Sequence, residues 1–85
     1  MALSETRIED TKKSIESYIV NKIFEETGYT KRQILNQFVL SRTHELLMDT
    51  NTGLYLESPT LVLELYRAEI NNNEERFNWL LDPNT

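Results

Sequence analysis

The sequence predicts an all-α fold, a compact bundle of three to five helices with a short extended segment near residues 54–57. Apolar side chains recur at the three- and four-residue spacing of helices, and serine or threonine precedes several of these runs where an N-cap is expected. Glycine-containing turns separate the runs at Gly28 and at residues 50–53. Because the chain has 85 residues, we expect a single domain, residues 1–85.

The first helix is predicted over residues 6–27. Thr6 and Glu9 have the spacing of a capping box, in which two side chains satisfy free backbone amides at a helix start. Gly28 follows as the left-handed residue that ends many helices. The apolar stripe consists of Ile8, Ile15, Ile19, Val20, Ile23 and Phe24.

Charged residues of this helix are spaced for ion pairs between positions i and i+4. Each such pair is worth only about 0.3 kcal/mol when exposed, so we interpret them as a solvated face. The pairs are Glu9 with Lys13, Lys12 with Glu16, and Lys22 with Glu26.

The next helical segment is predicted over residues 31–48. Thr30 and Gln33 form a second capping-box pattern, and Tyr29 and Ile34 have the spacing of a hydrophobic staple. Ser41 interrupts the apolar rhythm near residue 40 and could cap a new helix. One long helix and two short helices both fit this pattern.

Two further helices are predicted over residues 59–70 and 74–81. Ser58 is a favoured N-cap and Pro59 suits the first helical position. A run of three asparagines at residues 71–73 has low helix propensity and weakens the pattern between them, although a single helix that continues through the run also fits. Pro83 should stop the second one.

Residues 49–57 begin like a calcium-binding loop, since Asp49, Asn51 and Glu57 occupy ligand positions one, three and nine of an EF-hand. The bidentate ligand at position twelve is missing, because Thr60 stands there. We therefore favour a simple turn, in which Asp49 ends a helix and Gly53 has a positive φ. Calcium binding through residues 49–57 remains an alternative.

Catalytic groups are sparse. His44 is the only histidine, and on a helix it would share a face with Ser41 while Glu45 points about 100° away. The chain has no cysteine, and its two glycines cannot make a glycine-rich phosphate loop. We expect no enzymatic activity, no cofactor and no metal site outside the loop alternative.

The net charge of −5 argues against a nucleic-acid partner, which normally requires a basic face. Lys31, Arg32 and Arg42 are the residues that could contact phosphate, so a small DNA-binding transcriptional regulator is the other alternative.

No apolar run approaches the length of about 20 residues that is needed to cross a bilayer. We expect a cytoplasmic protein that does not enter a membrane.

Four aromatic residues in the C-terminal half are candidates for a partner interface: Tyr55, Tyr66, Phe77 and Trp79. Tyr66 and Phe77 are better suited to completing the small core. Trp79 lies off the apolar face formed by Phe77, Leu80 and Leu81 and should be exposed. A helical chain of this size commonly gains core by association, so we expect a protein partner or a homodimer.

Two stretches, TKRQILNQF and THELLMDTNTGLYLESP, followed by an amphipathic helix, resemble small bacterial proteins of unknown function. Some comparable proteins are encoded beside toxin-like partners. The resemblance covers residues 15–70, and no catalytic motif accompanies it. It implies a bacterial regulatory or antitoxin-like binding protein. The sequence therefore favours a non-enzymatic protein–protein interaction module.

Overall fold

Helix boundaries in this chain are set by capping side chains at nearly every start. The computed structural model describes residues 2–82, with side chains from Thr6 onward. This part of the chain is all-α, a small bundle as predicted. Its elements are α1 (Ala2–Thr27), α2 (Lys31–Val39), α3 (Arg42–Met48), the 3-10 turns η1 (Thr50–Thr52) and η2 (Leu54–Leu56), α4 (Pro59–Ile70) and α5 (Glu74–Leu81).

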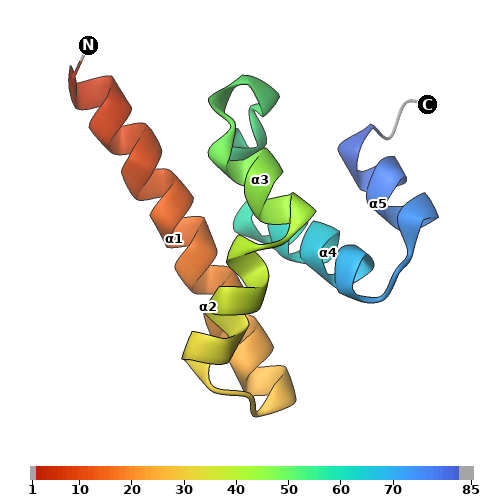
Figure 1. The fold of residues 1–85 in the computed structure, drawn as a ribbon. Helices are drawn as coiled ribbons and strands as arrows, with labels where there is room; N and C mark the ends of the chain where they lie inside the picture. The colour runs from red at the N-terminus through yellow and green to blue at the C-terminus, as the bar shows by residue number, and fades with distance from the viewer. Residues whose placement is uncertain (1, 83–85) are drawn as a thin grey trace.

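The long helix α1 forms one side of the molecule, and the shorter helices pack along it (Figure 1). α2 lies against the C-terminal half of α1, and α3 continues from α2 in a new direction. α4 packs on both α1 and α3, whereas α5 packs mainly on α4, on the side away from α1. The molecule is flat, with principal extents of 39 × 35 × 19 Å.

The predicted capping box at the start of α2 is present. The Gln33 backbone amide donates to Thr30 Oγ1 at 3.1 Å, and the Thr30 amide donates to Gln33 Oε1 at 3.0 Å. Gly28 has a φ of +76°, as expected of the residue after a helix. The start of α4 also agrees with the prediction, because Ser58 Oγ accepts from the Leu61 amide and Pro59 follows it.

The open question near residue 40 is resolved in favour of two short helices. α2 ends at Val39, and α3 begins after Ser41, whose hydroxyl oxygen accepts from the His44 amide at 3.0 Å. The break turns the chain, because Ser41 has an extended backbone conformation with φ −83° and ψ 158°. Phe38 on α2 and Leu47 on α3 can thereby both reach the core.

The helix start predicted at residue 6 is wrong. α1 begins at Ala2, so Thr6 lies inside the helix and does not cap it. Residues 2–5 include Ala, Leu and Glu, which favour the helix and let it extend past the capping-box pattern. The break between α4 and α5 is where the asparagines were expected to place it, with Asn72 at φ 55° and Asn73 capping α5. Pro83 lies outside the described residues.

The extended segment predicted near residues 54–57 is instead a 3-10 turn over Leu54–Leu56. Gly53 reverses the chain with a φ of +69°, and the Leu56 and Glu57 amides then bond back to Gly53 and Leu54. This turn directs Leu54 into the core at 5% exposure. Within residues 54–57 the extended backbone is confined to Glu57, and Ser58, the N-cap of α4, continues it.

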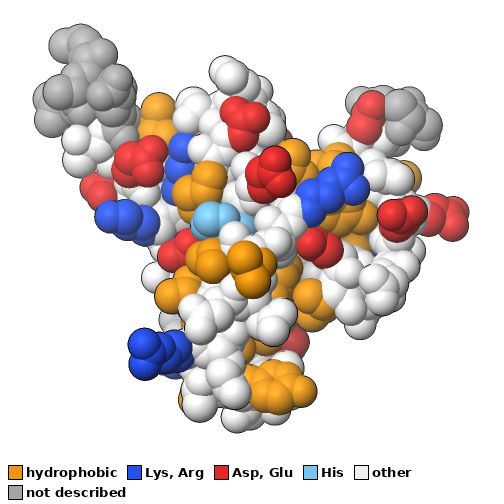
Figure 2. Space-filling model, viewed as in Figure 1, with side chains coloured by type: hydrophobic (Ala, Val, Ile, Leu, Met, Phe, Trp, Pro, Cys, Tyr) orange, Lys and Arg blue, Asp and Glu red, His pale blue; other side chains and the backbone are white. Residues whose placement is uncertain are grey.

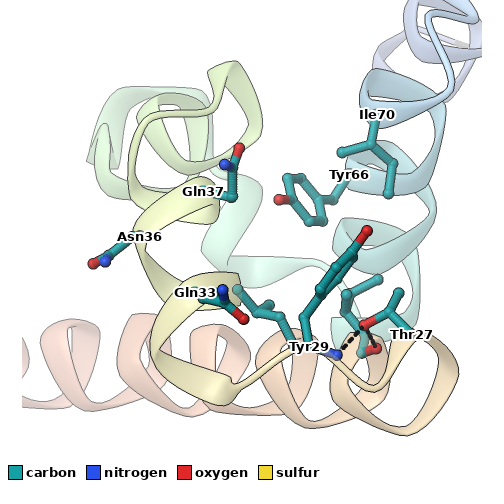
Figure 3. A pocket seen from close by; sticks show the side chains of 9 residues that line it. Thr27, Tyr29, Gln33, Asn36, Gln37, Tyr66 and Ile70 are labelled. Atoms are coloured by element: carbon teal, nitrogen blue, oxygen red, sulfur yellow. Dashed lines mark hydrogen bonds between the residues drawn. The ribbon is translucent and has the colours of Figure 1, made fainter.

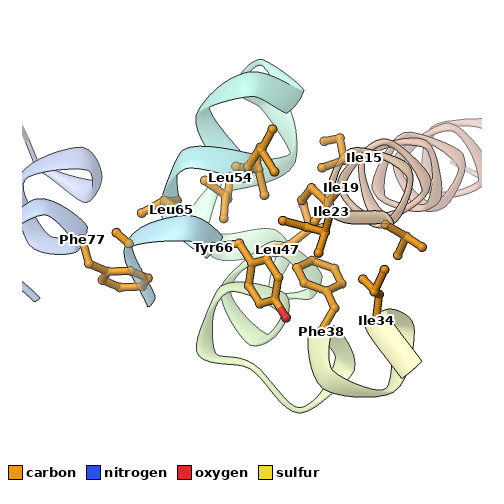
Figure 4. Close-up of a cluster of buried hydrophobic side chains, with 14 residues drawn as sticks. Ile15, Ile19, Ile23, Ile34, Phe38, Leu47, Leu54, Leu65, Tyr66 and Phe77 are labelled. Atoms are coloured by element: carbon orange, nitrogen blue, oxygen red, sulfur yellow. The ribbon is translucent and has the colours of Figure 1, made fainter. Parts of the chain in front are cut away.

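One core joins all the helices (Figure 4). Phe38 occupies its centre, and its ring meets Tyr66 edge-on at 5.0 Å between ring centroids. The predicted α1 stripe enters the core at Ile15, Ile19, Val20 and Ile23, whereas Ile8 is not part of it and Phe24 is 41% exposed. The buried apolar side chains are Ile15, Ile19, Val20, Ile23, Ile34, Phe38, Leu47, Leu54, Val62, Leu63, Leu65, Tyr66, Ala68 and Phe77.

The solvated ion-pair face predicted on α1 is wrong at Lys12, which is only 2% exposed. Its ammonium donates to the Met48 carbonyl at 2.8 Å and to Thr50 Oγ1 at 2.9 Å, and lies 3.5 Å from Glu9. Lys12 thereby attaches the end of α3 and the following turn to α1.

The expected partners of the other charged residues also differ. Ion pairs within α1 join residues three positions apart, not four, as between Lys22 Nζ and Glu25 Oε2 at 3.9 Å. Two carboxylates reach other elements instead: Glu16 contacts His44, and Glu26 pairs with Arg67. Contacts with other helices thus determine which ion pairs form, because an exposed ion pair within one helix is too weak to do so.

Glu69 on α4 holds the start of α3. Its carboxylate accepts from the Arg42 amide at 2.8 Å, and from both the amide and the hydroxyl of Thr43 at 2.9 and 2.7 Å. Those two amides open α3 and have no partner within the helix. Since Thr43 is fully buried, this carboxylate satisfies polar groups that water cannot reach.

Replacing Lys12 by Met should retain the packing of the side-chain stem but remove the donors to Met48 and Thr50. We expect the free energy of unfolding to fall by about 1.5–3 kcal/mol, as for a lost charged hydrogen bond. Urea denaturation measures this, with Lys13→Met as the exposed control, expected within about 0.5 kcal/mol of wild type. Equal stabilities for the two variants would contradict the role given to Lys12.

Replacing Glu69 by Ala should leave the Arg42 and Thr43 amides without an acceptor. A loss of about 1–3 kcal/mol is expected, because unpaired polar groups at a buried position carry their desolvation cost. Thermal and urea unfolding report it, and Asp10→Ala on the exposed side of α1 serves as the control. If Glu69→Ala unfolds like that control, the carboxylate does not hold α3 in place.

Candidate binding groove

An open groove of about 590 Å³ lies between the end of α1, the outer turns of α2 and the end of α4 (Figure 3). Its volume falls within the range of about 300–1,000 Å³ that is usual for ligand sites. Two of the lining residues come from α1, four from α2 and two from α4, and Tyr29 comes from the loop between α1 and α2. They are Ile23, Thr27, Tyr29, Gln33, Ile34, Asn36, Gln37, Tyr66 and Ile70.

None of the lining residues carries a charge, although 27% of the chain is charged. Ile23 and Ile34 are buried and form an apolar base, and Ile70 continues it at 49% exposure. Carboxamides and hydroxyls surround this apolar surface. A groove of this kind favours an uncharged ligand with apolar side chains, because it offers no ion to pair with a buried charge.

Tyr66 is the polar centre of the groove. The residue is only 4% exposed, with its ring packed on Phe38, yet its hydroxyl points into the space between α2 and α4 (Figure 3). No hydrogen bond joins this hydroxyl to another described residue, and no side-chain atom of the described residues is both buried and unpaired. The hydroxyl is therefore open to solvent in the groove, where it can bind a ligand atom in place of water.

Burial raises the pKa of the Tyr66 phenol above its ordinary value of 10.0, and the nearby carboxylate of Glu69 raises it further. Both effects disfavour the phenolate. The hydroxyl therefore stays protonated at neutral pH and can donate to a carbonyl or similar acceptor.

The aromatic residues proposed from the sequence do not form one surface. Tyr66 lies in the groove, while Phe77 is buried at 3% exposure under Arg42, whose guanidinium is 4.9 Å from its ring centroid. Tyr55 is half-buried near Lys12, at 5.7 Å. Trp79 is 51% exposed on α5, as its position suggested.

The residues considered as calcium ligands lie in or beside the turn after α3, and Asp49 stabilises it. Asp49 Oδ1 accepts from the Asn51 amide at 3.0 Å and so caps η1, and Gly53 takes the positive φ that the turn interpretation requires. Glu57 is exposed. Across the described residues, no three His, Asp or Glu side chains gather closely enough to hold a metal ion.

His44 and Ser41 are used in packing and capping. Ser41 Oγ accepts from the His44 amide and donates to the Phe38 carbonyl at 2.6 Å. The His44 ring lies edge-on to Phe38, and its Nε2 is 3.3 Å from Glu16. Glu45, the adjacent acid, is exposed.

The basic residues considered for DNA are directed onto different elements. Lys31 lies 5.2 Å from the Phe24 ring centroid on α1, and Arg42 lies over Phe77 on α5. Each cation covers an aromatic ring beside it. The structure therefore does not gather these two side chains into one basic patch.

Sequence reasoning missed the groove. Gln33 was assigned only to a cap, and Asn36 and Gln37 to nothing, although residues 33–41 form a run without charge in a highly charged chain. That run also exposes apolar side chains, namely Leu35 and Val39 on α2 and Leu40 at its C-cap. Figure 2 shows apolar surface gathered in the middle of this face, with charged side chains spread around it.

Comparisons of this chain with protein-family models, with curated proteins and with solved structures found no match. Among the described helices, none combines the length and the apolar composition needed to cross a lipid bilayer.

Titration of the tyrosines should show one phenol that ionises later than the rest. The unfolded Tyr66 phenol loses its proton near pH 10.0 and the folded one at higher pH, so folding stability falls as pH rises above 10.0. Tyr66→Phe should remove the late step from the ultraviolet absorbance titration, whereas Tyr29→Phe should retain it. A wild-type titration without a late phenol would contradict the burial of Tyr66.

Proposed function

We propose that this chain is a non-enzymatic protein-binding module of the bacterial cytoplasm and that the groove between α1, α2 and α4 is its binding site. One observation carries the proposal: Tyr66, whose ring is packed in the core, directs a protonated hydroxyl that is open to solvent into an uncharged groove with an apolar base. A bound peptide would supply both an apolar side chain for the base and a carbonyl for the hydroxyl.

The composition of the groove supports a protein ligand. Centres of protein interfaces are depleted of charge and rich in aromatic residues, and Tyr29 and Tyr66 both line this uncharged surface. Leu35 and Val39 on α2 and Leu40 at its C-cap add exposed apolar side chains outside the groove lining. Its lining groups are suited to hydrogen bonding rather than to proton transfer, since carboxamides and hydroxyls do not titrate near neutral pH.

The regulatory or antitoxin-like role follows from the resemblance of residues 15–70 to small bacterial proteins, some of them encoded beside toxin-like partners. Such a role requires a binding surface and no catalytic centre. The absence of cysteine from the chain suits a reducing cytoplasm.

Photo-crosslinking from inside the groove tests the proposal. A benzoylphenylalanine placed at Gln37, an exposed residue of the groove wall, should form a covalent adduct with one protein species in living cells. The same group at Glu57, exposed on the turn before α4, is the matched control and should not capture that species. Mass spectrometry identifies the adduct.

Loss of the adduct in an Ile70→Gln background would strengthen the assignment, because that change removes apolar surface from the groove without adding charge. If Gln37 and Glu57 give the same products, or neither gives any, the groove is not the binding site.

A further inference from the structure

We propose that the groove is occupied by the end of α5, residues 78–81, from a second copy of this chain, in a reciprocal pair. The inference rests on the proposed function, since it names the partner of the same groove. Three properties of the two surfaces support it: their lack of charge, their exposed apolar side chains and their complementary hydrogen-bonding groups.

Charge restricts where two copies can meet. Each copy carries a net charge of −5, so approach through acidic surfaces is repulsive. The groove has no charged lining residue, and residues 77–81 of α5 contain none either. Asp82, the first charge after this turn, would remain at the solvated rim of the contact.

The end of α5 presents apolar surface that its own chain leaves uncovered. Trp79 is 51% exposed and Leu81 is 40% exposed. α5 packs mainly on α4 and stands apart from α1 (Figure 1), so its far side faces solvent. Tryptophan is enriched among the residues that contribute most binding energy near the centre of interfaces, and the Ile23–Ile34–Ile70 surface of the groove would receive it.

The hydrogen-bond acceptors at the end of α5 are complementary to the donors in the groove. The last four carbonyls of a helix lack partners within the helix. In α5 the Asp82 amide donates to the Asn78 carbonyl at 3.0 Å, and among the described residues no other amide donates to the carbonyls of the final turn. Tyr66 offers a hydroxyl donor in the groove, and the Gln33 and Gln37 carboxamides offer further donors at its wall.

The positions of the two surfaces allow a closed pair. Ile70, the last residue of α4, lines the groove, and α5 begins at Glu74 after a short turn. A twofold axis beside this turn would insert each α5 into the other groove and bury two equivalent contacts. The pair then closes on itself and does not extend into a fibre.

Sedimentation equilibrium over a range of concentrations tests the inference. Wild type should form a dimer and nothing larger, while Trp79→Ala and Ile70→Gln should each weaken association at least about tenfold. Tyr66→Phe should weaken it about 2- to 10-fold, as for one neutral hydrogen bond. Leu56→Ala, which removes an apolar side chain that is 76% exposed elsewhere, should leave association unchanged.

Mixing the variants separates a reciprocal pair from other dimers. A Trp79→Ala copy retains an intact groove, and an Ile70→Gln copy retains an intact α5. Because Trp79 and Ile70 would touch in the proposed contact, their losses within one contact should not add. The mixture should therefore form a heterodimer with one intact contact, more stable than either mutant homodimer. Circular dichroism of each variant confirms that the helices are retained.

The inference would be overturned if the wild-type chain stayed monomeric, or if Trp79→Ala and Ile70→Gln left the dissociation constant of the dimer unchanged. The protein-binding function would still stand if the benzoylphenylalanine at Gln37 captured a different protein. It would fall if that probe captured neither a second copy nor another protein, or if the probes at Gln37 and Glu57 captured the same products.

Discussion

The carboxylate of Glu69 is the constraint on which the rest of this structure depends. It accepts hydrogen bonds from two amides and one hydroxyl at the start of α3, and so joins α4 to the point where α2 ends and α3 begins. Charge-assisted bonds of this kind are stronger than neutral ones. Since α2 and α4 form two walls of the groove, the same carboxylate fixes their separation and raises the pKa of the Tyr66 phenol.

A small flat domain cannot cover all of its apolar surface. The core is centred on Phe38 and is completed by one face of each helix, while Lys12 secures the turn after α3 to α1. What remains outside is an uncharged groove and a C-terminal helix attached mainly to α4. Both features leave apolar side chains in water, which a protein partner would cover.

Local signals in the sequence were sufficient for most of the fold. The caps at Thr30 and Ser58 and the turn at Gly28 act within a few residues, so they could be recognised without knowing the packing. Contacts between segments that are far apart in the sequence could not be predicted from local patterns. Lys12 is 36 residues from the carbonyl that it binds, and Tyr66 forms the groove with residues of α1 and α2. Trp79 could be placed correctly because its exposure follows from the face of its own helix.

The central claim is that an uncharged groove beside Tyr66 receives the last turn of α5 from a second molecule. Isotope-filtered nuclear Overhauser spectroscopy on a mixture of labelled and unlabelled chains tests it most directly. We predict intermolecular contacts from the indole of Trp79 to the methyl groups of Ile23, Ile34 and Ile70. Spectra at dimer-forming concentrations in which the Trp79 indole contacts only its own chain would contradict the account.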